Sequence, residues 1–150
     1  MSSLLKVLLT AGAVGVIIAI AYYVLFVIGV FKMYEKMGEP GWKAIIPIYN
    51  GYVLMKHTWS TTAFWIMLAL AVVYGIVSKG DSTVMQFLTI VFGLGLTVFQ
   101  VISANKQAKS FGYGMGMTPL LFFIGAIGTM VLGFGDCSYL GNTTPDDSFM

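Results

Sequence analysis

One uncharged stretch, Val7–Phe31, constrains the fold of this chain more than any other feature of the sequence. It lies between Lys6 and Lys32. An α-helix rises about 1.5 Å per residue, so it needs about 20 mostly apolar residues to cross roughly 30 Å of hydrocarbon. The apolar part of a cleaved signal peptide is shorter, at about 7–15 residues. We therefore expect a membrane-spanning helix in the first part of the chain.

Composition extends this expectation to the rest of the sequence. Of the 150 residues, 58% are apolar and only 9% are charged. Soluble domains average about 25% charged residues, so a soluble core of this size cannot hide so much apolar surface. The length fits a single domain, residues 1–150. The chain has no Arg, the residue best suited to phosphate recognition, so we expect the lipid bilayer and not nucleic acid as a partner.

Three further apolar stretches follow the first one. The sequence predicts an all-α integral membrane protein with four transmembrane helices, followed by a polar tail, residues 136–150. The expected spans are about 7–31, 61–78, 83–104 and 117–135. Only a tight polar turn, Lys79–Ser82, separates the second span from the third, so these two spans are expected to form an antiparallel hairpin.

Small residues recur at four-residue intervals along the spans. Such stripes let the backbones of membrane helices approach closely. We predict that each of the four spans carries such a stripe, and that the stripes pack the helices together. The predicted helix-packing residues are Ala11, Gly15, Ala19, Gly93, Gly125 and Gly133.

Lysines are distributed unevenly between the two predicted sides of the membrane. The loops after the first and third spans carry Lys32, Lys36, Lys43, Lys56, Lys106 and Lys109, and the opposite side carries Lys6 and Lys79. Lysine-rich loops tend to stay in the cytoplasm. The two long loops are therefore predicted to be cytoplasmic, and an even number of spans then places both termini on the extracytoplasmic side.

The sequence shows no constellation of side chains typical of an enzyme or a metal site. It has one cysteine, Cys137, and one histidine, His57, which has no acidic neighbour in sequence. No span has Asp, Glu, Lys, Arg or His at its centre, and ion-coupled transporters usually need such groups. We therefore expect no catalytic residue, cofactor or metal.

Two functional hypotheses remain. The first is a non-enzymatic structural or accessory subunit of a larger membrane assembly, which packs against other membrane proteins or against itself. The second is an oligomeric pore or transporter for a small solute, lined by Gln86, Thr97 and Gln100.

Two polar stretches interrupt the apolar pattern, Phe31–Asn50 and Asn105–Gly116. The first is expected to form an interfacial elbow between the first two spans, in which Gly38 ends the first helix. If the two stretches meet beneath the bundle, their aromatic side chains form one floor. The candidate interface residues are Lys36, Gly38, Gly41, Trp42, Pro47, Tyr49, Asn50, Lys109, Phe111 and Gly112.

The same residues resemble an uncharacterised family of small bacterial membrane proteins. Its members show a K-x-G-x-x-G-W-x-x-x-I-P-x-Y-N run after the first span and a K-S-F-G run after the third, which correspond here to 36–50 and 109–112. Such proteins are sometimes labelled signal peptidase I, but this chain lacks the Ser-Met-x-Pro box of that enzyme. The resemblance implies a multi-pass protein of the bacterial inner membrane, with no catalytic or binding residues to transfer.

Overall fold

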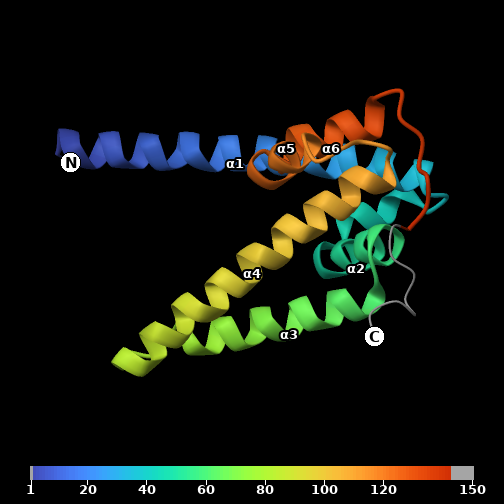
Figure 1. The fold of residues 1–150 in the computed structure, drawn as a ribbon. Helices are drawn as coiled ribbons and strands as arrows, with labels where there is room; N and C mark the ends of the chain where they lie inside the picture. The colour runs from blue at the N-terminus through green and yellow to red at the C-terminus, as the bar shows by residue number, and fades with distance from the viewer. Residues whose placement is uncertain (1, 143–150) are drawn as a thin grey trace.

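The computed structural model describes residues 2–142, and this part of the chain is entirely helical apart from its connections. Residues 2–142 form six α-helices, which are labelled in Figure 1, and one short 3-10 helix, η1. Their bounds are α1 Ser3–Lys36, η1 Gly41–Ile45, α2 Pro47–Thr58, α3 Thr61–Val77, α4 Thr83–Ser110, α5 Met117–Phe123 and α6 Gly125–Phe134. The second and third predicted helices thus begin where they were expected, whereas α1 and α4 are longer than the predicted spans.

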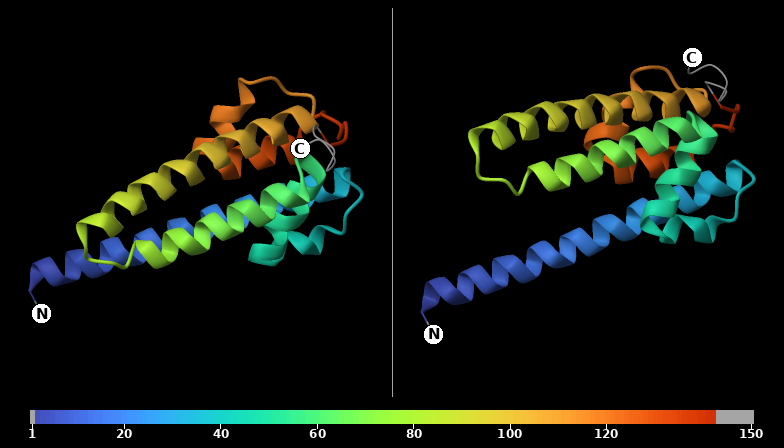
Figure 2. Two further views of the ribbon diagram at one scale, coloured as in Figure 1. Left: turned by 60° about the horizontal axis from the view of Figure 1, so that its bottom comes forward. Right: turned by 90° about the horizontal axis from the view of Figure 1, so that it is seen from below.

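Long arms extend in one direction from a more compact head (Figures 1 and 2). We use "head" for residues 29–60 and 103–142. One arm is the first part of α1, and the other is the antiparallel hairpin of α3 and α4, as the short turn between them predicted. Ser82 caps α4 by accepting a hydrogen bond from the N–H of Met85 at 3.3 Å. The two arms stand apart from each other in both Figure 1 and the right view of Figure 2.

The arms present apolar side chains on nearly every face. Residues 2–25 are all exposed, and the side chains of Leu8 and Phe87 are 68% and 65% exposed. Two helices, α1 and α4, are long and apolar enough to cross a membrane, while α3 and α6 are shorter apolar helices. So much exposed apolar surface is unfavourable in water, at roughly 25 cal/mol per Å².

The centre of the head is the crossing of α1 and α6. A Cβ atom added to Gly29 would lie 2.6 Å from the side-chain oxygen of Thr129, and one added to Gly133 would lie 2.6 Å from the carbonyl oxygen of Gly29. Glycine at these two positions is therefore what allows the helix backbones to touch. Val30, Met33, Tyr34 and Leu132 pack around this crossing and are completely buried.

The fourth predicted span, 117–135, is not one helix. The chain leaves helical geometry at Ile124, where φ is −129° and ψ is 60°, and α5 and α6 are separate helices. At this turn, the N–H of Ile124 donates to the carbonyl of Leu120 at 3.0 Å, and the N–H of Ala126 donates to the hydroxyl of Tyr22 at 3.3 Å. These contacts satisfy backbone groups that a break in a helix would otherwise leave without partners.

The break reverses the direction of the chain. Along α1, contacts proceed from Tyr22 with Ala126, through the crossing at Gly29, to Lys36 with the carbonyl of Leu132, so α6 runs parallel to α1. The segment after α6 then reaches the end of α4, where the N–H of Leu140 donates to the carbonyl of Ser110 at 2.7 Å.

The start of α1 and the end of the described chain therefore lie at opposite ends of the molecule (Figure 1). The prediction that both termini are extracytoplasmic rests on four complete spans, and it stays a prediction because the arrangement of the described helices does not fix a membrane side for either terminus. Residues 143–150 of the predicted polar tail lie outside the described residues.

Candidate functional site

The two motif glycines end the two longest helices in the same way. Gly38 follows α1 with φ +76°, and Gly112 follows α4 with φ +78°. In both cases, the N–H of the next residue donates to the carbonyl five residues earlier, at 2.9 Å. This is the Schellman arrangement, in which the residue after the helix adopts a left-handed backbone conformation. Glycine is favoured there because it has no Cβ atom to clash. Each glycine turns the chain into the head directly after a long helix.

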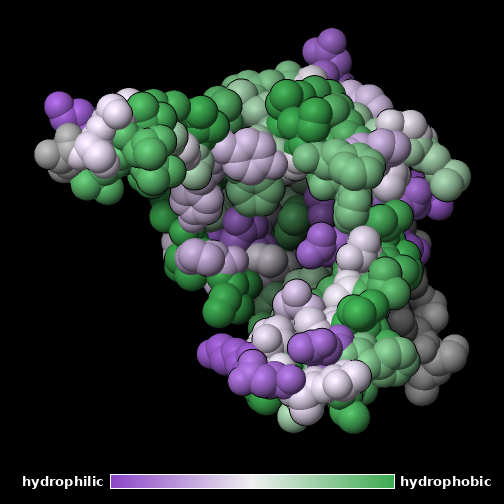
Figure 3. All heavy atoms as spheres, turned by 90° about the vertical axis from the view of Figure 1, so that its left-hand side faces the viewer, coloured by the Kyte–Doolittle hydropathy of each residue, from purple (hydrophilic) through white to green (hydrophobic). Residues whose placement is uncertain are grey.

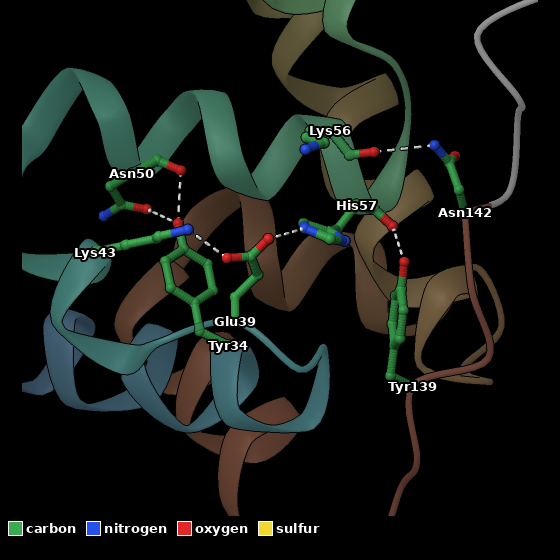
Figure 4. Close-up of polar contacts among 8 residues, drawn as sticks. All are labelled: Tyr34, Glu39, Lys43, Asn50, Lys56, His57, Tyr139 and Asn142. Atoms are coloured by element: carbon green, nitrogen blue, oxygen red, sulfur yellow. Dashed lines mark hydrogen bonds and ion pairs between the residues drawn. The ribbon is translucent and has the colours of Figure 1, made fainter.

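Asn50 joins three elements of the head (Figure 4). Its side-chain amide nitrogen donates to the carbonyl of Ala44 in η1 at 3.0 Å. The hydroxyl of Tyr34 in α1 lies 2.8 Å from the side-chain oxygen of Asn50 and 2.6 Å from its backbone oxygen. Asn50 and Tyr34 are both buried, so these bonds fix η1 and α2 against α1.

Glu39 lies between two basic side chains (Figure 4). One carboxylate oxygen is 2.5 Å from Nζ of Lys43 and the other is 2.8 Å from Nε2 of His57. The hydrogen bond from Lys43, and then that from His57, hold the pKa of the Glu39 carboxyl below its usual value. Glu39 in turn raises the pKa of Lys43. This charged cluster links the loop after α1 to both η1 and α2.

The segment after α6 is tied to the end of α2. The Tyr139 hydroxyl donates to the carbonyl of His57, and the side-chain nitrogen of Asn142 donates to the carbonyl of Lys56 at 3.0 Å (Figure 4). Burial raises the pKa of Tyr139. Because His57 also binds Glu39, the loop after α1 and the segment after α6 both contact this histidine.

Lys36 caps the last turn of α6. Its ammonium donates to the carbonyls of Leu132 and Gly135, both at 2.7 Å, and lies 3.5 Å from the sulfur of Cys137. Carbonyls at a helix C-terminus lack intrahelical donors and carry partial negative charge, which a lysine can satisfy. A residue expected at an interfacial elbow thus holds the α1–α6 pair together.

The remaining candidate interface residues do not form one aromatic floor. Phe111 is buried against Tyr139, with ring centroids 5.6 Å apart, whereas Trp42 and Tyr49 are 54% and 38% exposed. Gly41 is buried against the ring of Phe31. Pro47 is the first residue of α2, and Lys109 is exposed near the end of α4.

The predicted helix-packing residues fall into two groups. Gly133 lies in the α1–α6 crossing, Gly125 lies beside Tyr22, and an added Cβ on Gly93 would be 3.4 Å from the ring of Tyr74 in α3. The stripe of Ala11, Gly15 and Ala19 on α1 is exposed, and an added Cβ on Gly15 would meet no atom within 4 Å. This stripe therefore packs against nothing within the described chain.

The hydrogen bonds and ion pairs of the head hold its backbone segments against one another. The residues that the structure describes offer no metal site. Among residues 2–142, no three His, Cys, Asp or Glu side chains are grouped to hold a metal. Tyr34, Glu39 and Tyr139 were not singled out from the sequence. The acid that meets His57 lies 18 residues away along the chain, and the only local signal was the i, i+4 spacing of Glu39 and Lys43.

Comparison with known families identifies the chain. Residues 42–142 match the model of a family of unknown function, DUF5684. The chain is a DUF5684 protein. The matched region includes every described element from α2 to α6 and leaves out α1. This result confirms the coarser expectation of an uncharacterised family. No curated protein and no solved structure matches the DUF5684 protein.

Proposed function

We propose that this chain is an integral protein of the bacterial inner membrane. In this arrangement α1, α3 and α4 span the bilayer, and α5 and α6, although part of the head, form a re-entrant pair that enters the bilayer from the side of the head loops and returns to that side. The support is the exposed apolar surface of the arms, together with polar and charged contacts concentrated in the head. Seventeen residues in α3 give about 25 Å, near the lower limit for a span.

The lysine distribution favours a cytoplasmic location for the loops of the head. Six lysines belong to the head or its loops, whereas the free ends of the arms carry Lys6 and Lys79. On this proposal Trp42, Ile45 and Ile48, which are all more than half exposed, form the interfacial elbow at the cytoplasmic surface. The segment 136–142 then faces the cytoplasm, and residue 2 lies outside.

Cysteine labelling in intact cells tests this topology. Starting from Cys137→Ser, we would introduce Ser3→Cys, Lys79→Cys, Gly114→Cys or Ser138→Cys one at a time. A membrane-impermeant maleimide should label the first two in intact cells and the last two only after the membrane is opened. Labelling of Ser138→Cys in intact cells would contradict the re-entrant pair and favour four complete spans.

Within the membrane, we infer that the protein is a non-enzymatic accessory subunit that docks through α1. The observation that carries this is the contrast between two small-residue sites on one helix. The backbone of α6 packs directly against Gly29, whereas the Ala11–Gly15–Ala19 stripe is exposed. Ala11 and Gly15 lie in a shallow groove that is also bordered by Val7, Val14 and Ile18. Small-residue stripes of this kind allow a second helix to approach closely.

Complex size in mild detergent tests the accessory role. Gly15→Leu fills the groove, and Ala13→Leu adds a similar side chain about 160° around the helix, so it serves as the matched control. We expect Gly15→Leu to shift the protein to a smaller complex and Ala13→Leu to leave the size unchanged. Co-expression of two differently tagged copies separates self-association from binding to another protein. Equal complex sizes for the wild type and both variants would refute docking through this stripe.

A further inference from the structure

A polar groove lies where the two arms meet the head. It has a volume of about 310 Å³ and is lined by residues from four helices. Its polar side chains are Gln100, Ser103 and Gln107 of α4, and its apolar walls include Phe26 of α1, Met67 of α3 and Phe122 of α5. Figure 3, which looks along the arms from their free ends, shows a hollow between them with hydrophilic residues inside it.

The polar side chains form a ladder along one face of α4. Residues at i, i+3 and i+7 lie on the same side of a helix, so Gln100, Ser103 and Gln107 all face the groove. The ladder covers about 10 Å along the helix axis. The Gln107 amide donates to the hydroxyl of Ser103 at 3.3 Å. Within residues 2–142, the Gln100 side chain makes no hydrogen bond and is exposed.

This ladder runs from the head into the proposed hydrocarbon layer. Gln107 is next to Lys106, at the edge of the head, and Gln100 lies deeper between the arms. An unpaired amide in hydrocarbon is unfavourable by several kcal/mol, so the groove needs an occupant with hydrogen-bonding groups. None of the residues that line the groove is charged, which disfavours a phosphate or another ion as the group held there.

We propose that this groove binds one glycerolipid from the surrounding bilayer. Its glycerol and ester oxygens, which lie just below the headgroups, accept hydrogen bonds from the amides of Gln100 and Gln107. Its acyl chains lie against Phe26 and Phe122 and fill the space between the arms. The pocket is also large enough for such a group, since ligand sites begin at about 300 Å³.

The charge distribution around the groove supports this choice of ligand. Lys32, the nearest lysine on α1, pairs with Glu35 at 2.7 Å, and its Cβ lies beside Gly133, on the α6 side of α1. Lys32 is therefore not placed to draw a lipid headgroup phosphate into the groove. The phosphate can stay at the membrane surface while the ester region of the lipid occupies the groove. This inference depends on the proposed membrane embedding but not on the accessory role of the α1 stripe.

Photocrosslinking in vesicles tests the proposal. The full chain is reconstituted in phosphatidylethanolamine and phosphatidylglycerol with a trace of a phospholipid that carries a diazirine near the ester end of one acyl chain. After illumination, mass spectrometry maps the attached sites. Adducts are expected to concentrate on Phe26, Met67 and Phe122. An even distribution over the exposed residues of both arms would overturn the proposal.

Two comparisons identify the contacts. Gln100→Leu and Gln107→Leu together should reduce groove adducts by about tenfold, because two neutral hydrogen bonds are lost. Gln86→Leu makes the same chemical change near the other end of α4, so it is the matched control and should have no effect. Unchanged adducts in the double variant would refute the assigned contacts.

A lipid competition experiment uses the wild-type protein, so its result does not depend on whether a variant folds. Unlabelled diester lipid should suppress the groove adducts more strongly than the diether analogue, which lacks the ester carbonyls. Equal competition would contradict hydrogen bonding to the esters. A photoreactive residue at position 122 that crosslinked to a second copy of the chain instead of lipid would also overturn the proposal.

Discussion

The α1–α6 crossing predicts that Gly29→Ala destabilises the protein. The new Cβ would lie 2.6 Å from the Thr129 side-chain oxygen and 2.7 Å from the backbone nitrogen of Met130. Ordinary van der Waals contact begins at about 3.4 Å. Because one of the clashing atoms belongs to the backbone, α1 and α6 must separate, and overpacking of this kind costs up to about 3 kcal/mol. The higher helix propensity of alanine returns about 1 kcal/mol, which leaves a net loss of about 2 kcal/mol.

Reversible unfolding in mixed detergent micelles measures this difference. A loss of about 2 kcal/mol is roughly a thirtyfold change in the unfolding equilibrium. Gly15→Ala is the matched control on the same helix, since its added Cβ meets no atom within 4 Å. We expect this control to be neutral or slightly more stable. If Gly29→Ala were as stable as Gly15→Ala, the close contact between α1 and α6 would be refuted.

Two further predictions concern the head. Lys36→Met should lower the free energy of unfolding by about 2–3 kcal/mol, because α6 loses its charged cap. Lys32→Met, which removes an exposed ion pair, should lower it by less than about 1 kcal/mol. Equal losses in the two variants, measured by thermal denaturation, would contradict the capping role. The lowered pKa of Glu39 stabilises the fold at pH values above its ordinary value of 4.5, and this contribution is lost as pH falls from there through the folded-state pKa. Thermal stability should therefore fall less steeply below that pH in Glu39→Gln than in the wild type, and parallel curves would disprove the linkage.

Local sequence patterns predicted most of the helices. The polar turn Lys79–Ser82 and the apolar runs on either side of it were sufficient to predict the α3–α4 hairpin, because the residues that determine a hairpin lie close together in the sequence. Gly38 was also expected to end α1, and its left-handed backbone explains why the helix stops there. The exposed arms agree with a composition that has too few charged residues for a soluble surface.

The break at Ile124 could not be predicted in the same way. Residues 117–135 form an apolar run long enough for one span, and its one proline, Pro119, lies in the first turn of α5, five residues before the break. The turn depends on Tyr22 and the crossing on Gly29, both about 100 residues earlier. The contact between Glu39 and His57 was missed for a related reason, since the intervening turn and helix bring them together.

The parallel packing of α1 against α6 has a consequence for biosynthesis. Lys36 and its partner Leu132 are separated by 96 residues, and ribosomes add about 5–20 residues each second. Once α1 has been made, roughly 5–20 s therefore pass before the segment that packs against it has been synthesised. During this interval Gly29 and Lys36 are open to whatever helix is nearby in the membrane. A protein that shields α1 in this period would act as an assembly chaperone for the newly made chain.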